Sequence, residues 1–283
     1  MSEHLTHLDI LKKSTEYLTK KGIPNSKCDA EWMISHVTKK KKLELYLEYG
    51  NFVKEKDINE IRQCIIKRGK RIPLQHIIGK VNFAGYELKC DKRALIPRPE
   101  TEYFTELINE RIAFGYKGKI LDFGTGSGAI IITLCIKNKN CKGFGMDKSS
   151  NALSLAKENI QLHNLKNIEL QNFDWSTDNL NSSYGVIVSN PPYLTNNEWN
   201  CAEPEVKVFD PKLALVSQEN GLSDIHYIID HAKKSLIKGG LLALEIGIGQ
   251  KEIITKYMND KFSKIEVVKD FCHRERYIFA YKK

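Results

Sequence analysis

The chain has 283 residues, of which 41% are hydrophobic, and it contains three Trp, twelve Tyr and eleven Phe. This apolar content is enough for one or two folded domains, so the composition excludes a wholly disordered chain. The 44 basic and 35 acidic residues give a formal net charge of +9, which by itself suggests binding to nucleic acid.

The distribution of the charge argues against that first interpretation. Residues 1–80 carry 17 basic and 10 acidic residues, which leaves 27 basic and 25 acidic residues for positions 81–283. Only eight of the basic residues are arginine, the side chain that binds phosphates and guanines with two parallel hydrogen bonds. We therefore interpret the excess as a surface for an acidic protein partner or as a lysine-rich background, and we expect no sequence-specific nucleic-acid binding.

The cysteines and the apolar segments indicate a cytoplasmic protein. The seven cysteines form no C-x-x-C pair and no zinc-like spacing with histidine, so we predict reduced thiols and no metal site. The start of the chain lacks the pattern of a signal peptide, and the apolar stretch at 129–136 is much shorter than the roughly 18 residues of a membrane span. We expect a monomer in the cytoplasm, or in the matrix of an organelle, with no membrane contact.

Residues 1–75 have the apolar spacing of helices and are predicted to form a small helical domain. Pro24 interrupts the first helix, and Ser26 is expected to cap the second. The run Lys39–Lys42 is interpreted as a solvated helix end or loop. Around Gly85 the pattern favours a β-hairpin, so residues 76–95 are predicted to be a hairpin linker.

Residues 96–283 show strands that alternate with helices, such as the helices expected at 152–163 and 223–236. This alternation predicts an α/β fold with a doubly wound, mostly parallel seven-stranded sheet and helices on both faces. The last two strands are joined by a loop too short for a crossover helix and should pair antiparallel. The expected strands are 120–123, 143–147, 168–173, 186–189, 241–246, 265–268 and 277–281.

A glycine-rich loop follows the first of these strands and opens onto a helix. Glycines let a ligand approach the backbone closely, and the helix start offers free N–H groups. The pattern G-x-G-x-G is common in sites for S-adenosylmethionine, but Gly124, Gly126 and Ala129 also satisfy the dinucleotide pattern. The candidate cofactor-binding residues of the loop are Gly124, Thr125, Gly126, Ser127 and Gly128.

Three further residues are candidates for binding the same cofactor. Asp147 ends the second strand, where a carboxylate can accept both ribose hydroxyls, although it could instead cap the next helix. Asp174 and Trp175 follow the third strand. We expect Trp175 to lie against an adenine ring and Asp174 to accept from its amino group, with a buried structural Trp as the alternative.

The fourth strand ends in Asn190-Pro191-Pro192-Tyr193, which we interpret as the catalytic and substrate-binding turn. Two consecutive prolines fix φ and remove two N–H donors, so the turn is stiff and presents carbonyl oxygens. The side-chain oxygen of Asn190 and the carbonyl oxygen of Pro191 can each accept one N–H of a planar amino or amide group. The ring of Tyr193 can stack on that planar group. Hydride transfer has no use for this arrangement, so the turn favours S-adenosylmethionine as the cofactor.

The turn alone leaves open whether the acceptor is a nucleobase or a glutamine. The chain resembles the protein-glutamine methyltransferases of peptide-chain release factors, the PrmC/HemK family, over roughly residues 8–283. The segments that carry the resemblance are Pro73–Gly79, Leu95–Glu102, Glu205-Val206, Phe209–Pro211, Leu213–Leu215 and Gly221-Leu222. His76 departs from the Tyr found in many members.

The resemblance implies a class I methyltransferase domain behind a helical domain that docks the release factor. It implies methyl transfer from S-adenosylmethionine to the glutamine of the Gly-Gly-Gln motif, with S-adenosylhomocysteine as the product. Its cofactor contacts carry over to the glycine loop, Asp147, Trp175 and Asn190, and Arg98 is expected to shape the pocket wall. The alternatives are a DNA or RNA amino-group methyltransferase and a non-catalytic nucleic-acid or ribosome-binding module.

Overall fold

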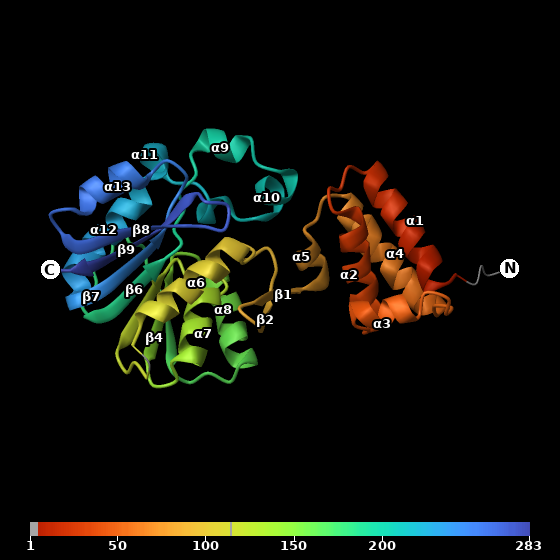
Figure 1. Cartoon of the computed structure of the whole chain (residues 1–283), viewed down its shortest axis with the longest axis horizontal. Coiled ribbons are helices and arrows are strands. Elements are labelled where there is room, and N and C mark those ends of the chain that lie inside the picture. Colours follow the sequence, from red (N-terminus) through yellow and green to blue (C-terminus); the bar gives the residue numbers. More distant parts are fainter. Residues whose placement is uncertain (1–4, 114) are drawn as a thin grey trace. The chain divides into compact units, whose positions relative to one another are not determined.

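The computed structural model describes residues 5–113 and 115–283. Its contacts divide the chain into two compact units, with the division between Gly79 and Lys80 (Figure 1). Each unit has its own hydrophobic core. Among the described residues, no helix combines the length and the apolar character needed to cross a membrane.

The first unit consists of helices packed around a core that includes Leu18, Met33 and Ile61. Asn25 precedes the second helix, and Ser26 is its first residue, with the Ser26 hydroxyl donating to the carbonyl of Ile23. The prediction that Ser26 caps this helix is therefore wrong, because its hydroxyl bonds backward instead of to the helix start. The helices are α1 (His7–Lys20), α2 (Ser26–Thr38), α3 (Lys42–Leu47), α4 (Glu55–Gly69) and α5 (Leu74–Ile78).

A two-stranded antiparallel hairpin, β1 (Lys80–Phe83) and β2 (Tyr86–Lys89), begins the second unit. Phe83 and Leu88 are buried in the same cluster as the helices that cover one face of the main sheet. The side-chain amide of Asn159 bonds the backbone of Lys89 at both its N–H and its carbonyl, which attaches the hairpin to the second unit.

The main sheet has seven strands in the order β5-β4-β3-β6-β7-β9-β8. The strands from β5 to β7 are parallel, whereas β9 is antiparallel to both of its neighbours. The predicted class, a mostly parallel seven-stranded sheet behind a helical domain, is confirmed, and so is the antiparallel final pair. The strands are β3 (Lys119–Phe123), β4 (Lys142–Asp147), β5 (Ile168–Asn172), β6 (Tyr184–Ser189), β7 (Leu236–Glu245), β8 (Phe262–Lys269) and β9 (Glu275–Lys282).

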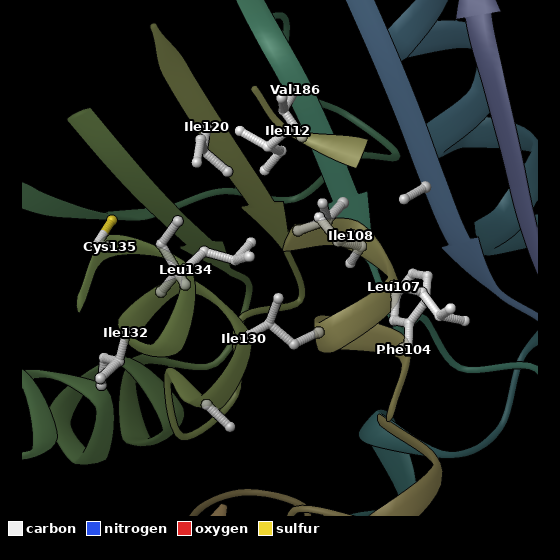
Figure 2. Packing of buried hydrophobic residues seen from close by; sticks show 14 of the residues in the cluster. Phe104, Leu107, Ile108, Ile112, Ile120, Ile130, Ile132, Leu134, Cys135 and Val186 are labelled. Atoms are coloured by element: carbon white, nitrogen blue, oxygen red, sulfur yellow. The ribbon is translucent and has the colours of Figure 1, made fainter. Parts of the chain in front are cut away.

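Successive residues of the central strands face opposite sides, so each face of the sheet has its own core. Ile120 and Val186 belong to the same cluster as side chains of α6 and α7, several of which Figure 2 shows, whereas Leu121 and Ile187 pack with α12 and α13 on the other face. The helices of this unit are α6 (Pro99–Arg111), α7 (Ala129–Lys137), α8 (Ser150–Leu162), α9 (Asn196–Asn200), α10 (Pro204–Phe209), α11 (Gln218–Gly221), α12 (Ser223–Ser235) and α13 (Lys251–Met258), with a 3-10 turn at Lys212–Ala214.

Candidate functional site

The glycine loop and the Asn-Pro-Pro-Tyr turn lie side by side at the carboxyl edge of the sheet. Strands β3 and β6 are parallel neighbours, and Phe123 pairs in register with Ser189. The Ser189 hydroxyl also donates to the Phe123 carbonyl oxygen at 2.7 Å. Because both loops begin one residue beyond this pair, two segments 66 residues apart in the sequence meet at one place.

The backbone of the glycine loop is bound to the carboxylate of Asp147. The N–H of Gly126 donates to Asp147 Oδ2 at 2.9 Å, and the N–H of Ser149 donates to Oδ1 at 2.8 Å. Ser149, not Asp147, caps the next helix, since its hydroxyl accepts from the N–H of Ala152. Burial raises the pKa of Asp147, and the two backbone N–H groups oppose that shift.

A second carboxyl group, Asp122, lies beneath the loop. Its Oδ2 accepts from the hydroxyl of Thr125 at 2.7 Å, so the Thr125 side chain points into the protein interior. Burial raises the pKa of Asp122 to about 7, with the nearby Asp147 carboxylate adding to the shift. The loop is therefore held from below by a carboxyl group that titrates near neutral pH.

A pocket of about 170 Å³ opens between the glycine loop and the turn. Predicted site residues that line it are Gly124, Gly126, Asp147, Asp174, Trp175, Asn190 and Pro192. In the part of the chain that the structure describes, the predicted residues outside this lining are Thr125, Ser127, Gly128, Pro191 and Tyr193. Lining residues that were not among the predicted site residues include Arg93, Ala94, Leu95, Ser149, Leu213 and Asp224.

Asp174 and Trp175 form one wall of the pocket. The indole N–H of Trp175 donates to Asp224 Oδ1 at 2.7 Å, which fixes the orientation of the ring. Asp174 pairs with the Lys148 ammonium at 2.6 Å and accepts from the hydroxyl of Ser176, and these bonds lower its pKa. Asp174 is thus an ionised acceptor at the pocket wall, and its contact with an adenine amino group stays a prediction.

Asn190 joins the pocket to a set of buried polar side chains. Its Nδ2 donates to the hydroxyl oxygen of Thr101 at 2.8 Å, and the Thr101 hydroxyl donates to Glu245 Oε2 at 2.8 Å. Thr101 is 6% exposed and Glu245 1% exposed. Burial raises the pKa of Glu245, and the Arg276 guanidinium and the bonds from Thr101 and Tyr193 oppose that shift.

Tyr193 is bound to the same buried group. The Arg276 Nη2 donates to the Tyr193 hydroxyl at 2.6 Å, and that hydroxyl donates to Glu245 Oε1 at 3.3 Å. The Arg276 guanidinium also lies 4.7 Å from the centre of the tyrosine ring, on one of its faces. The expected stacking of the ring on a substrate stays a prediction and concerns the remaining face.

Sequence reasoning missed Thr101, Glu245 and Arg276 as parts of the site. They lie 89 residues before Asn190, and 55 and 86 residues after it, on three different elements. The family-like segment Leu95–Glu102 was a signal for Thr101, since it contains that residue. The same segment carries Arg98, whose guanidinium pairs with the buried Asp210 at 2.5 Å, and its expected place in the pocket wall stays a prediction.

The pocket has the chemistry of a site for a nucleoside-like cofactor. A Cβ atom added at Gly124, where φ is +68°, would lie 3.4 Å from the Trp175 ring and would narrow the space between loop and ring. Carboxylates at Asp147, Asp174 and Asp224 are acceptors for hydroxyl and amino groups. The residues present therefore fit S-adenosylmethionine, and the expected contacts of Trp175 with its ring, of Asp147 with its ribose hydroxyls and of the loop with its polar tail stay predictions.

Comparison with known families and proteins agrees with this chemistry. The family described as PrmC N-terminal domain matches residues 9–79, and the family described as Methyltransferase small domain matches residues 99–204. The release factor glutamine methyltransferase of Fusobacterium nucleatum is 37% identical over 280 residues, covering 98% of this chain and 79% of the relative. The enzyme of the same name from Thermodesulfovibrio yellowstonii is 36% identical over 257 residues, covering 90% and 92%.

Solved structures extend the likeness of fold to more distant proteins. A methyltransferase from Pyrococcus furiosus superposes with a TM-score of 0.52 at 18% identity, covering 70% of this chain and 89% of that one. The 16S rRNA N2 G1207 methyltransferase of Thermus thermophilus superposes with a TM-score of 0.51 at 16% identity, covering 72% and 50%. At these identities the likeness concerns the fold alone.

Proposed function

The chain belongs to the release factor glutamine methyltransferase family, and on that premise we propose that it methylates the glutamine of the Gly-Gly-Gln motif in peptide-chain release factors. It is an S-adenosylmethionine-dependent protein-glutamine N-methyltransferase. The acceptor atom in this proposal is the side-chain amide nitrogen of that glutamine.

One observation carries the proposal: a single pocket collects Gly124, Asp147 and Trp175 on one side and Asn190 on the other. The first three have the chemistry to hold the methyl donor. Asn190 begins the turn whose carbonyl groups can accept an amide –NH2. A donor and an acceptor held in one pocket react without the entropic cost of a chance encounter.

The turn would orient a nitrogen that is a poor nucleophile. The lone pair of an amide nitrogen is delocalised, so the nitrogen must leave planarity to react. Asn190 Oδ1 and the Pro191 carbonyl oxygen would each accept one of its N–H groups and stabilise the positive charge that develops. S-adenosylmethionine, which Gly124, Asp147 and Trp175 would hold, would supply the electrophilic methyl group, and S-adenosylhomocysteine would be the leaving group. The surplus amide proton then leaves to solvent.

The helical unit is the proposed docking domain for the release factor. It carries most of the excess positive charge of the chain, with 17 basic and 10 acidic residues in positions 1–80. Its exposed apolar side chains include Trp32, Leu43 and Leu47, and the Lys42 ammonium lies 4.5 Å from the Trp32 ring centre. A surface of this kind suits a protein partner with acidic groups at its contact face.

The test is a radiolabelled methyl-transfer assay that offers purified release factor, RNA and DNA side by side. We expect the release factor to be labelled. A release factor whose acceptor glutamine is replaced by alanine should not be labelled. An Asn190→Ala variant should lose about 100-fold or more in kcat, the scale expected for removing one stabilising group of a transition state. Label in nucleic acid alone, or undiminished activity of the variant, would contradict the proposal.

A further inference from the structure

We propose that Thr101 and Glu245 are positioning residues that hold the Asn190 side chain with its oxygen, not its nitrogen, toward the acceptor amide. This inference rests on the proposed role of Asn190 as the group that accepts an N–H bond from the substrate. It assigns to two buried residues the task of setting the direction of that bond.

The orientation of the Asn190 side-chain amide follows from the single hydrogen that the Thr101 hydroxyl can donate. An asparagine amide has an oxygen that only accepts and a nitrogen that only donates, and a simple rotation exchanges them. The Arg276 guanidinium, 3.7 Å from Glu245 Oε1, favours the ionised form of this carboxyl group. An ionised carboxylate only accepts, so the single hydrogen of the Thr101 hydroxyl goes to Glu245 Oε2, at 2.8 Å. Thr101 Oγ1 then has only lone pairs to offer to Asn190, and it receives the Nδ2–H at 2.8 Å. Asn190 Oδ1 is left as the acceptor.

The second oxygen of Glu245 fixes Tyr193 by the same logic. Arg276 can only donate, and its Nη2 lies 2.6 Å from the Tyr193 hydroxyl oxygen. The tyrosine hydrogen is therefore directed to Glu245 Oε1, 3.3 Å away. One carboxylate thus anchors both side chains of the turn that are proposed to contact substrate, with one oxygen for each.

The fold gives this anchor a fixed place. Ser189 of β6 pairs in parallel register with Leu244 of β7, so the residues that follow them, Asn190 and Glu245, end neighbouring strands at the same level. Thr101 lies in the first turn of α6, where its hydroxyl group contacts both Asn190 and Glu245. Because Thr101 and Glu245 are almost fully buried, water has little access to replace a lost partner.

The first test uses three threonine variants. Thr101→Val keeps the shape but removes the acceptor for Asn190 Nδ2, and we expect kcat to fall about 10- to 100-fold, the range set by leaving a buried donor unpaired. Thr101→Ser keeps the hydroxyl and should restore kcat to within about threefold, because its single hydrogen and lone pairs permit the same directions. Thr105→Val is the matched control, since that buried hydroxyl, one helical turn later, bonds only backward to the Thr101 carbonyl in the described part of the chain.

Glu245→Gln tests the direction itself. A glutamine can donate to Thr101, which frees the Thr101 hydrogen to bond Asn190 Oδ1 and turns the Asn190 nitrogen toward the acceptor. We expect a fall in kcat of about tenfold or more while the melting temperature and the dissociation constant of S-adenosylmethionine stay close to those of Thr105→Val. A merely structural role would instead lower the melting temperature and leave the kcat of the folded fraction unchanged.

The outcomes separate this inference from the proposed function. If wild type methylates the release factor and Asn190→Ala abolishes methylation, the proposed function holds. If Thr101→Val and Glu245→Gln then keep the kcat of Thr105→Val, the positioning role is wrong. If wild type fails to methylate the release factor, the proposed function fails first, whatever these variants do.

Discussion

The two walls of the pocket are built in opposite ways. The glycine-loop wall owes its shape to small residues and backbone: Gly124 leaves space beside Trp175, and the Gly126 N–H bonds Asp147. The wall formed by the turn depends on polar side chains from other elements, because Asn190 is bonded to Thr101, and Tyr193, behind the wall, is bonded to Glu245. A loop that must fit closely around a ligand is made by local sequence, whereas a turn that must aim single atoms depends on distant side chains.

Behind each wall lies one buried carboxyl group, and the two have different partners. Glu245 has the Arg276 guanidinium at 3.7 Å and accepts hydrogen bonds on both of its oxygens. Asp122 accepts from the Thr125 hydroxyl, and the charged group that acts on its pKa is another acid, Asp147. The acid under the turn is compensated by a cation, and the acid under the loop is not.

Gly221→Ala should break the wall formed by the turn and have the largest effect. Gly221 has φ of +83°, and a Cβ there would collide with the carbonyl oxygen of Tyr193. We expect a loss of roughly 4 kcal/mol in the free energy of unfolding together with most of the activity, combining backbone strain and displacement of the turn. Urea unfolding and methyl-transfer assays measure both.

Gly239→Ala is the control for that substitution. Its φ is +72°, but no described atom lies within 4 Å of the added Cβ. It should cost only about 1 kcal/mol, the strain of the left-handed backbone alone. Equal losses in the two variants would mean that the contact with Tyr193 is unimportant.

Asp122→Asn tests whether the acid under the loop, which lacks a compensating cation, makes the stability of the protein depend on pH. The folded pKa of Asp122 is about 7, whereas the unfolded value is 3.8, so the native state binds more protons between these pH values. The free energy of unfolding of wild type should therefore fall as pH rises from about 4 to 7, by on the order of 3 kcal/mol from this group. The variant should lack that decline when unfolding is followed in urea across the same pH range.

If the free energy of unfolding of the Asp122→Asn variant still falls with rising pH, other acidic groups cause that remaining dependence. Other acids with raised pKa values, such as Asp147 and Asp210, add slopes of the same sign that persist in the variant. The informative quantity is therefore the difference between wild type and Asp122→Asn. A difference that does not change with pH would contradict the titration assigned to Asp122.

Gly124→Ala should have the smallest effect and act on the glycine-loop wall alone. The added Cβ lies 3.4 Å from the Trp175 ring, and the backbone is strained at φ of +68°. We expect the dissociation constant for S-adenosylmethionine to rise about tenfold, equivalent to about 1.4 kcal/mol, with little change in KM for the release factor. Isothermal titration calorimetry measures the first quantity.

Gly85→Ala provides the comparison for this variant. It places a Cβ at φ of +85° in the hairpin turn, with no described atom within 4 Å. It should affect stability by a similar small amount and leave donor affinity unchanged. A matching loss of donor affinity would show that general strain, not the space beside Trp175, governs binding.

The glycine loop could be predicted because its signals are local. The strand, the glycines and the helix start occur within ten residues, and the partners Asp147 and Trp175 follow at strand ends that alternation of strands and helices already marks. The mostly parallel sheet and its antiparallel final pair could be predicted from the same alternation and from the short final loop. These features depend on periodicity and on turn chemistry, which a single sequence displays.

The partners of the turn could not be predicted on those grounds. In the sequence, Thr101 is one polar residue in a polar segment, and Glu245 is a single charged residue within an apolar strand. Their roles arise from strand register and from the packing of α6 above the sheet, which no local pattern specifies. Ser26 shows the same limit on a smaller scale, because its hydroxyl donates to the carbonyl of Ile23, a partner that the local pattern did not indicate.

The position of β9 has a consequence for the order in which the site is assembled. This strand follows β8 in the chain but lies between β7 and β8 in the sheet, and it carries Arg276. During synthesis, one edge of β7 therefore stays unpaired until β9, the last strand of the described fold, has been made and has inserted beside it. The guanidinium that offsets the charge of Glu245 belongs to β9, so the side chains behind the turn have their cation only once this strand has paired with β7.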